Sequence, residues 1–578
     1  MRHRPGAGTG TKAAVAAFVR CGTGAWTARA VLAVAIAVLP ANGWAQPPQH
    51  AAIASAHPLA TRAGHQVLAA GGNAFDAAVA VSATLSVVEP YSSGLGGGGF
   101  WLLRRASDGH EVMVDGRERA PLAARRDMYL DADGEVVAGL SLDGPLAAGI
   151  PGSPAALALI AQRYGRLPLS ASLATAVRLA REGFPVTELY RRQAQRRLDA
   201  LTVSPAADVL LDAGQIPDVG QPVRQPALAA TLEALARRGH DGFYRGPVAA
   251  GLVADVRAAG GIWAPEDLEA YRALEREPVR GEYRGMRVVS ASPPSSGGIV
   301  LIEMLNILSG LELDRGTPVE RTHLLVEAMR RAYRDRARHL GDPDFVRIDV
   351  PLLLSPGYAA GLRESIGPRA TPSGDLPGYR GRAAGRDTTH LSVIDREGNL
   401  VAATLSINYP FGSGYLSPAT GVLLNNEMDD FSVKPGVANV YGLVGAEANA
   451  VAPGKRPLSS MSPTFLETGG RVVALGTPGG SRIITMVLLA AMDVADGVGG
   501  VEDWVARPRF HHQYLPDQVV YEPQAFDAVT AAGLLALGHR LSERERGYGN
   551  MQAVVWNKGT GEVDAASDPR GEGQAIVR

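Results

Sequence analysis

The sequence predicts an α/β fold in which β-sheets are sandwiched between layers of α-helices. Helical and extended patterns alternate from Gln46 onward without a clear linker, an order that fits this architecture better than a helix bundle or an all-β barrel. Hydrophobic residues make up 46% of the 578 residues and charged residues 20%, so the chain has enough apolar material for a sizeable core. We therefore expect one large folded region, mainly helical in its first part and richer in strands after Thr388.

Alanine-rich and amphipathic runs predict the helices of the first part. The helix over 74–88 should end before Glu89-Pro90, because a proline disfavours helical geometry in the residue before it. The expected elements are helices at 57–70, 74–88, 171–182, 228–238, 248–259, 299–308 and 319–340, and strands at 100–105 and 111–116.

A β-hairpin opens the second part. Two extended runs, 388–394 and 400–407, flank the turn-rich segment 395–399. A further strand is expected at 471–476, a helix at 481–495, and closing strands at 519–521 and 553–556.

The N-terminus is typical of an export signal. Basic residues precede the apolar run 30–39, which is too short to span a bilayer comfortably and is followed by small residues up to Ala45. We expect residues 1–45 to be removed, so that Gln46 begins a periplasmic or secreted protein; the alternative is an uncleaved membrane or interfacial anchor. The only cysteine, Cys21, lies in this segment, which excludes disulfides, zinc thiolates and a cysteine nucleophile from the mature chain.

Overall charge and three short motifs exclude other functions. Lys plus Arg (57) nearly equals Asp plus Glu (58), so no net field favours nucleic acid or an anionic membrane. The glycine run 94–99 follows a helix and precedes a strand, the reverse of a dinucleotide-binding loop, and is expected to allow close backbone packing. His511 and His512 are interpreted as structural, because adjacent strand residues point to opposite faces and no third metal ligand is evident. The arginine-rich run 330–338 is interpreted as a solvated helix face.

Thr388 is the candidate nucleophile. A threonine hydroxyl needs a base, and cleavage of the Asp387–Thr388 bond would free an α-amine to act as one. The preceding Gly/Arg-rich segment 379–386 is expected to be an exposed approach to this bond.

Polar residues follow Thr388 in an order that suits a catalytic site. Ser406 and Asn408 end the strand that pairs with the Thr388 strand, so both can lie beside the nucleophile. Glu427 and Asp430 belong to an acid and amide cluster that would suit a substrate ammonium group, although a helix N-cap or a calcium-binding acidic loop is an open alternative.

Two later motifs complete the candidate site. Ser459 and Ser460 offer hydroxyl donors for a carboxylate. Gly479 and Gly480 begin a predicted helix, where backbone N–H groups can be directed at an oxyanion.

Several long motifs together resemble the γ-glutamyltransferases, also called glutathione hydrolases. The resemblance runs from about Ala54 to Arg570 and is carried by DTTH at 387–390, LNNEMDDF at 424–431, KRPLSSMSPT at 455–464, TPGGSR at 477–482, and upstream by 89–99 and GRERAP at 116–121.

The resemblance implies a four-layer αββα N-terminal nucleophile hydrolase fold made as an inactive precursor. Self-cleavage between Asp387 and Thr388 would give a large subunit, 46–387, and a small subunit, 388–578, which remain together as a heterodimer in one domain.

It also implies a role for each candidate residue. Thr388 would accept the γ-glutamyl group, with its α-amine as base, and Ser406 stands where the family usually has a threonine hydroxyl. The remaining roles are α-carboxylate binding by Arg117, Ser459 and Ser460, α-ammonium binding by Asn408, Glu427 and Asp430, an oxyanion hole at Gly479 and Gly480, and closure of a lid loop, 435–453, by Tyr441.

The implied reaction transfers the γ-glutamyl group of glutathione or a similar compound to water or to an amino acid or dipeptide, without a metal or organic cofactor. One alternative is a related acylase acting on a glutaryl β-lactam side chain. That substrate lacks the α-ammonium for which Asn408, Glu427 and Asp430 are suited. The other alternative is an inactive exported binding protein.

Overall fold

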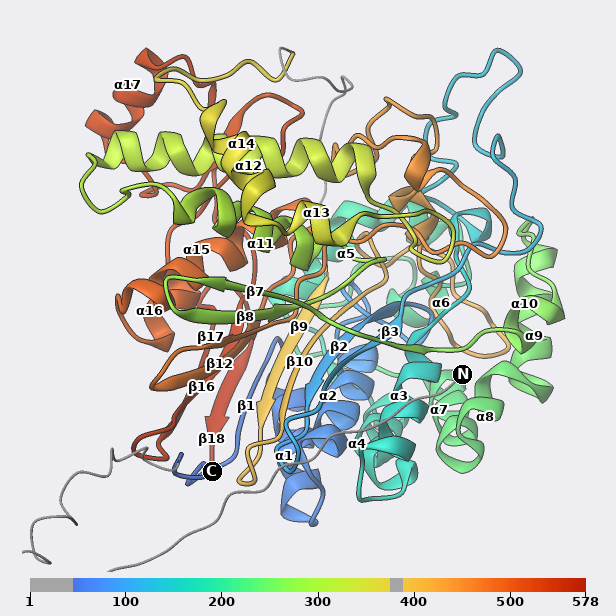
Figure 1. The fold of residues 1–578 in the computed structure, drawn as a ribbon. Helices are drawn as coiled ribbons and strands as arrows, with labels where there is room; N and C mark the ends of the chain where they lie inside the picture. Colours follow the sequence, from blue (N-terminus) through green and yellow to red (C-terminus); the bar gives the residue numbers. More distant parts are fainter. Residues whose placement is uncertain (1–44, 375–387) are drawn as a thin grey trace, which may run out of the picture. The chain divides into compact units, whose positions relative to one another are not determined.

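The computed structural model describes residues 45–374 and 388–578, and it places two β-sheets between two layers of helices (Figure 1). Asp387 and all but the last residue of the predicted signal lie outside the described residues. The predicted α/β class is confirmed. No helix within the described ranges is long and apolar enough to cross a membrane.

The first sheet has seven strands, and each pair of neighbours is antiparallel. Its order is β18 (Gln574–Val577), β1 (Ala52–Ser55), β9 (Thr389–Ile394), β10 (Leu400–Ser406), β2 (Gly98–Arg104), β3 (Glu111–Gly116) and β6 (Leu274–Arg276). The central hairpin β9–β10 is the one predicted from the sequence, and it brings the segments before β9 and after β10 to the same end of the sheet.

The second sheet has six strands and is also antiparallel. Its order is β17 (Val563–Ser567), β16 (Gln552–Asn557), β12 (Arg471–Gly476), β11 (Thr464–Glu467), β8 (Met286–Ser290) and β7 (Val279–Tyr283). Two small sheets pair β13 (Phe510–His511), β14 (Val519–Tyr521) and β15 (Leu541–Glu543), and β4 (Phe184–Pro185) with β5 (Pro222–Val223).

Three apolar layers hold these elements together. One cluster packs the early helices against the first sheet, a second packs the later helices against the second sheet, and a third, including Ala54, Leu102 and Phe465, fills the space between the sheets. Both faces of each sheet are therefore covered, which explains why β9 and β10 are buried along their whole length. The four layers are those of an αββα fold.

The outer helical layers come from separate parts of the chain. The early layer contains α1 (Pro58–Ala69), α2 (Ala74–Val88), α3 (Ser153–Arg163), α4 (Leu169–Glu182), α5 (Glu188–Thr202), α6 (Ala207–Leu210), α7 (Pro226–Arg238), α8 (His240–Tyr244), α9 (Gly246–Ala258) and α10 (Pro265–Glu269). The later helices are α11 (Gly297–Ser309), α12 (Pro318–His339), α13 (Val350–Leu353), α14 (Pro356–Glu364), α15 (Ile483–Asp496), α16 (Val501–Ala506) and α17 (Ala528–Ala536). Short 3₁₀ turns are η1 (Pro145–Ala147), η2 (Glu427–Asp430), η3 (Glu447–Asn449) and η4 (Gly480–Arg482).

The glycine run before β2 packs as predicted. A Cβ atom at Gly96 would collide with the carbonyl of Leu423, and one at Gly97 would collide with the carbonyl of Ser406. These glycines allow the backbone of β2 and the segment before it to lie against the end of β10.

The interpretation of the arginine run in α12 as a solvated face is wrong for three of its five arginines, whereas Arg338 is exposed as predicted. Arg330, Arg331 and Arg336 are buried. Glu327, one turn earlier on the helix, pairs with Arg330 at 3.1 Å and with Arg331 at 2.6 Å, and Asp517 also pairs with Arg330. Paired charges can be buried at a tolerable cost, and the sequence spacing alone did not reveal the distant partner.

Candidate active site

The hairpin places Thr388 beside the end of the neighbouring strand. Thr388 directly precedes β9 and is buried, and its Oγ1 lies 3.4 Å from the Oγ of Ser406, the last residue of β10. Thr389 of β9 pairs with Leu405 of β10, and this strand register places the preceding Thr388 next to Ser406. The predicted neighbourhood of Thr388 and Ser406 is therefore present.

Asn408 forms the turn that follows Ser406. Its backbone N–H donates to the Ser406 Oγ at 2.7 Å, and its φ of 74° lies in the left-handed region that asparagine tolerates better than most residues. The side-chain amide donates to the carbonyl of Asn426 at 2.8 Å. These contacts tie the end of β10 to the acidic segment that begins at Glu427.

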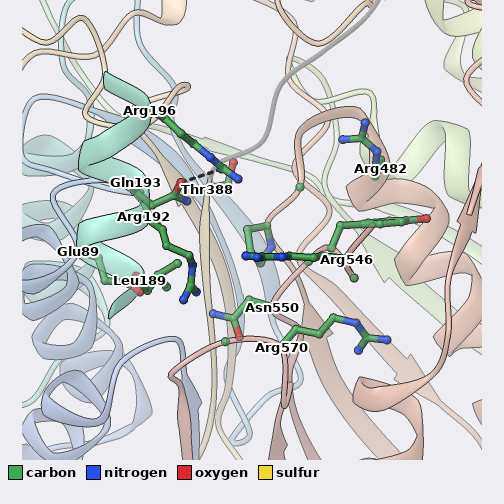
Figure 2. Close-up of a pocket in the computed structure, with 17 residues that line it drawn as sticks. Glu89, Leu189, Arg192, Gln193, Arg196, Thr388, Arg482, Arg546, Asn550 and Arg570 are labelled. Carbon is green, nitrogen blue, oxygen red and sulfur yellow. Dashed lines mark hydrogen bonds between the residues drawn. The ribbon is translucent and has the colours of Figure 1, made fainter. Parts of the chain in front are cut away.

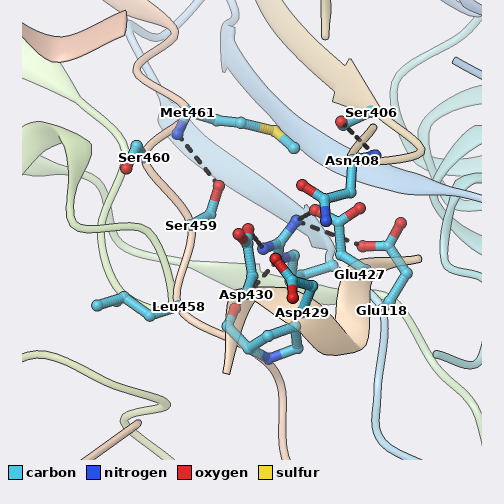
Figure 3. Close-up of polar contacts among 12 residues, drawn as sticks. Glu118, Ser406, Asn408, Glu427, Asp429, Asp430, Leu458, Ser459, Ser460 and Met461 are labelled. Atoms are coloured by element: carbon cyan, nitrogen blue, oxygen red, sulfur yellow. Dashed lines mark hydrogen bonds and ion pairs between the residues drawn. The ribbon is translucent and has the colours of Figure 1, made fainter. Parts of the chain in front are cut away.

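A buried arginine gathers the acidic residues of the site. Arg117 follows β3, and its guanidinium pairs with Glu427, with Asp430 at 2.6 Å, and at 3.7 Å with Glu118, as Figure 3 shows for these carboxylates. Arg117 Nε also donates to the carbonyl of Pro457 at 3.0 Å. Each of the three guanidinium nitrogens therefore has an acceptor in the protein, which fixes the orientation of the Arg117 side chain.

Carboxylates outnumber cations in this cluster. Burial is the main cause that raises the pKa of Glu118, Glu427 and Asp430, and it brings the pKa of Glu427 to about 7. Repulsion between neighbouring carboxylates adds to the rise for Glu118 and Glu427, whereas Arg117 opposes it. Both oxygens of Glu118 and Oε2 of Glu427 are buried without a hydrogen-bond partner among the described residues. A cationic ligand would complete this set.

The two serines lie on the opposite side of the cluster from Asn408 (Figure 3). Ser459 Oγ accepts a hydrogen bond from the backbone N–H of Met461 at 3.1 Å. Ser460 Oγ accepts one from Arg336 at 3.1 Å, and the same guanidinium donates to Ser296 at 2.9 Å. Arg336 therefore places a second buried positive charge behind the site, a feature that the sequence analysis missed because it assigned this arginine to solvent.

Two glycines form the backbone beside Thr388. Gly479 has a φ of 144° and Gly480 a φ of 58°, values that side chains rarely adopt, and both precede α15. A Cβ atom at Gly480 would also collide with the ring of Tyr441. Close approach of the backbone to a reacting atom is possible only because these residues are glycines.

Tyr441 covers the site from the segment predicted to be a lid. Its side chain is buried and its hydroxyl donates to the carbonyl of Asn408. Gln513 donates to the Tyr441 carbonyl at 3.2 Å and accepts a hydrogen bond from Ser481 at 2.6 Å. His511 lies 2.9 Å from the same Gln513 oxygen, in keeping with the structural interpretation of that histidine.

These residues enclose a small pocket that we call the acidic pocket. It has a volume of about 20 Å³, room for roughly one water molecule. Its lining contains most of the residues predicted from the sequence: Thr388, Ser406, Asn408, Glu427, Asp430, Tyr441, Ser459, Ser460 and Gly480. Arg117 contacts it through Glu427 and Asp430, and Gly479 lines a different pocket.

A second, larger pocket also contains Thr388. Its volume is about 390 Å³, and we call it the arginine groove because its lining includes Arg192, Arg196, Arg482, Arg546 and Arg570 (Figure 2). This groove was not predicted from the sequence. The spacing of Arg192 and Arg196 along α5 was the one available signal, since residues four apart share a helix face.

Glu89 is the acidic residue of the arginine groove. Thr389 Oγ1 donates to it at 2.8 Å, and burial, its largest influence, raises its pKa to about 7. The sequence indicated Glu89 as a helix end and as part of the motif 89–99, but not as a residue of this groove. Its hydrogen bond joins α2 to the first residue of β9 and so helps to fix the strand that follows Thr388.

One cluster has the composition of a metal site. Ligand atoms of His323, Glu327 and His539 lie within 4.8 Å of one another. The two histidines are hydrogen-bonded to each other at 2.8 Å, and Glu327 already pairs with Arg330 and Arg331. The adjacent arginines disfavour a cation, so the donor set does not fit a metal.

Comparison with known proteins identifies the family. The model of the family Gamma-glutamyltranspeptidase matches residues 60–578. The glutathione hydrolase proenzyme of Escherichia coli (strain K12) is 41% identical over 526 residues, 90% of each chain. A cephalosporin acylase structure from Bacillus halodurans superposes with a TM-score of 0.80 at 30% identity, covering 93% of this chain and 97% of that one. The Helicobacter pylori gamma-glutamyltranspeptidase structure gives a TM-score of 0.54 at 38% identity, covering 56% of this chain and 93% of that one. The chain therefore belongs to the gamma-glutamyltranspeptidase family.

Proposed function

We propose that this member of the family, a γ-glutamyltransferase and glutathione hydrolase with an N-terminal threonine nucleophile, carries the γ-glutamyl group on Thr388. The observation that carries this assignment is the position of Thr388, which lines the acidic pocket together with Ser406, Glu427 and Gly480. A nucleophile, a binding site for an amino-acid head group and a backbone suited to an oxyanion hole thus meet at one residue.

Activation requires that the chain be cut before Thr388. In this proposal the Thr388 hydroxyl attacks the carbonyl of Asp387, and the amide C–N bond breaks as an ester forms, which frees the α-amine of Thr388. Water then hydrolyses the ester, which leaves Asp387 with a free carboxylate, restores the Thr388 hydroxyl and separates the two chains. The products are a large subunit, 46–387, and a small subunit, 388–578, after removal of the export signal 1–45. The word proenzyme in the name of the Escherichia coli relative supports processing.

The free amine then acts as the base in turnover. It accepts the Thr388 hydroxyl proton while the oxygen attacks the γ-amide carbon of the donor. Backbone N–H groups at Gly479 and Gly480 stabilise the oxyanion, and the proton passes to the leaving amine as the C–N bond breaks. Water attacks the resulting ester to give glutamate.

Head-group recognition uses charges of both signs. The donor's α-ammonium is held by Asn408, Glu427 and Asp430, and its α-carboxylate by Arg117 with the hydroxyls of Ser459 and Ser460. The unpartnered oxygens of Glu118 and Glu427 support a cationic ligand here. Because the acidic pocket holds only about 20 Å³, Tyr441 and its segment must move to admit a glutamyl group.

The acceptors in this proposal are amino acids and dipeptides, whose amines replace water in the second step. The site of action is the periplasm or the exterior of the cell, as the basic and apolar N-terminus indicates.

A pair of chromogenic substrates tests the head-group assignment. The enzyme should hydrolyse γ-glutamyl-p-nitroanilide at least about a hundredfold faster, in kcat/KM, than glutaryl-p-nitroanilide, because the latter leaves the buried carboxylates without their cation. Equal rates would instead favour an acylase. A Thr388→Ala variant that lacks both activities links either rate to this site.

A further inference from the structure

The arginine groove and the acidic pocket meet at Thr388. Thr388 is the residue that the two linings share, and the glycine pair is divided between them, with Gly479 in the groove and Gly480 in the acidic pocket. In the proposed function, an acyl group bound in the acidic pocket has its carbonyl at Thr388, and the groove is the neighbouring space that can receive its leaving group.

Positive charge dominates the groove. Its lining has five arginines and one carboxylic acid, Glu89. Arg570 is neutralised by Glu522 at 2.7 Å and Asp568 at 3.0 Å. Arg196 donates to the neutral amide of Gln193 at 2.8 Å. Within the described ranges, neither Arg192 nor Arg546 has an ion pair or a hydrogen bond through its side chain.

These two arginines come from opposite walls. Arg192 lies on α5, and Arg546 lies in the loop between β15 and β16. Figure 2 shows both side chains extending into the space between the walls. Two guanidinium groups that face one open volume are suited to a carboxylate, which can accept two hydrogen bonds from each.

We propose that the arginine groove binds the C-terminal carboxylate of the peptide that leaves from, or attacks, the γ-glutamyl group. The dipeptide released from glutathione spans about 7 Å from its amine to its carboxylate, a length within reach of arginines around Thr388. Transfer to a dipeptide reverses the acylation step, so the attacking amine enters where the leaving amine departed. The same carboxylate site would thus bind the dipeptide that leaves in acylation and the dipeptide that attacks in transfer.

Bond changes are the same as in the established reaction. The amide C–N bond breaks as the ester to Thr388 forms, and the proton from the threonine hydroxyl goes to the leaving nitrogen through the α-amine. The arginines stay charged and act as binding groups on the departing or entering peptide.

The test compares glutathione with glutathione amidated at its C-terminal glycine, by the rate of glutamate release. The carboxylate proposal rests on the proposed function only in that the enzyme must hydrolyse glutathione. The proposed function and the carboxylate site can therefore fail separately in this test. If glutamate is released from neither donor, the proposed function is wrong. If kcat/KM is the same for both donors, the carboxylate site is wrong.

In the wild type, kcat/KM should be about tenfold higher for glutathione than for its amide, the effect of losing a charge-assisted hydrogen bond. This ratio of kcat/KM values should fall to about one in the double variant Arg192→Gln/Arg546→Gln. In the single variant Arg546→Lys, which keeps Arg192 and a positive charge at 546, the ratio should lie between that value and the wild-type value. It should also decline from low to high salt, because the groove is open to solvent.

Arg191→Gln is the matched control. Arg191 lies on the same helix but pairs with Asp218 at 3.1 Å and does not line the groove. This variant should keep the wild-type ratio. A ratio that is unchanged in the double variant, or one that falls equally in Arg191→Gln, would overturn the proposal. If the double variant fails to mature into two chains, the salt dependence of the wild-type ratio decides the matter.

Discussion

The two pockets that meet at Thr388 differ in both charge and size. The acidic pocket holds about 20 Å³ and is lined by Glu427 and Asp430, which pair with the buried Arg117. The arginine groove holds about 390 Å³ and presents five arginines against one carboxylic acid. A small pocket lined by buried charges suits a ligand of fixed structure, and a large one suits ligands that vary. The difference agrees with the proposal of a strict site for the donor head group on one side of Thr388 and a tolerant peptide site on the other.

Removal of the shared residue should abolish the function of both pockets. We expect Thr388→Ala to stay a single chain after export and to lose at least about a thousandfold in kcat, because the nucleophile and its amine are both lost. Gel electrophoresis and γ-glutamyl-p-nitroanilide hydrolysis measure these effects. Thr388→Ser, which keeps the hydroxyl, is the control and should retain cleavage. Wild-type turnover by Thr388→Ala would refute the assignment of the nucleophile.

Arg117→Lys should damage only the acidic pocket. Lysine cannot replace the planar pairing with Glu427 and Asp430, and breaking a buried network costs about 3 kcal/mol, or about a hundredfold in kcat/KM. The loss should be equal for glutathione and its amide. A loss confined to one of the two donors would mean that the pockets are not independent.

The pH dependence of donor binding should report on Glu427. Burial raises its pKa to about 7, so the side chain is neutral below that pH and negative above it. If Glu427 binds the α-ammonium of the donor as proposed, it does so in its negative form, so kcat/KM should rise as the pH passes through about 7. Glu427→Gln should flatten this rise and lower kcat/KM about tenfold at pH 8. A rise that is preserved in the variant would assign the titration to another group.

Ser406→Thr should have the smallest effect. The added methyl limits the rotamers of the hydroxyl that lies 3.4 Å from Thr388, and the expected change in kcat is about threefold or less, in the direction of an increase. The ratio between glutathione and its amide should not change. A loss of more than tenfold would show that the methyl does not fit beside the hairpin.

The sequence predicted the acidic pocket better than the arginine groove for a physical reason. The hairpin places Ser406 beside Thr388 through pairing of neighbouring strands, which the sequence pattern predicts. Gly479 and Gly480 have positive φ values, a conformation that glycine adopts readily and that its presence in the sequence makes plausible. The groove instead joins Arg192 to Arg546, residues far apart in the chain that meet only after the layers pack. No local pattern encodes such a contact.

The arginines of α12 also show that local sequence patterns do not reveal distant contacts. Their charge pattern is typical of a solvated helix, yet Arg330 is buried against Asp517 and Arg336 against Ser460. Tertiary packing supplied the partners that make these buried charges acceptable. The prediction from charge pattern alone was wrong for that reason.

The most direct test of the central assignment is the mass of each chain after a γ-glutamyl donor has been mixed with the purified protein and the reaction stopped by acid. The account predicts two chains, the smaller beginning at Thr388 and carrying one γ-glutamyl group on that residue. A single intact chain, or a γ-glutamyl group attached to any other residue, would contradict it.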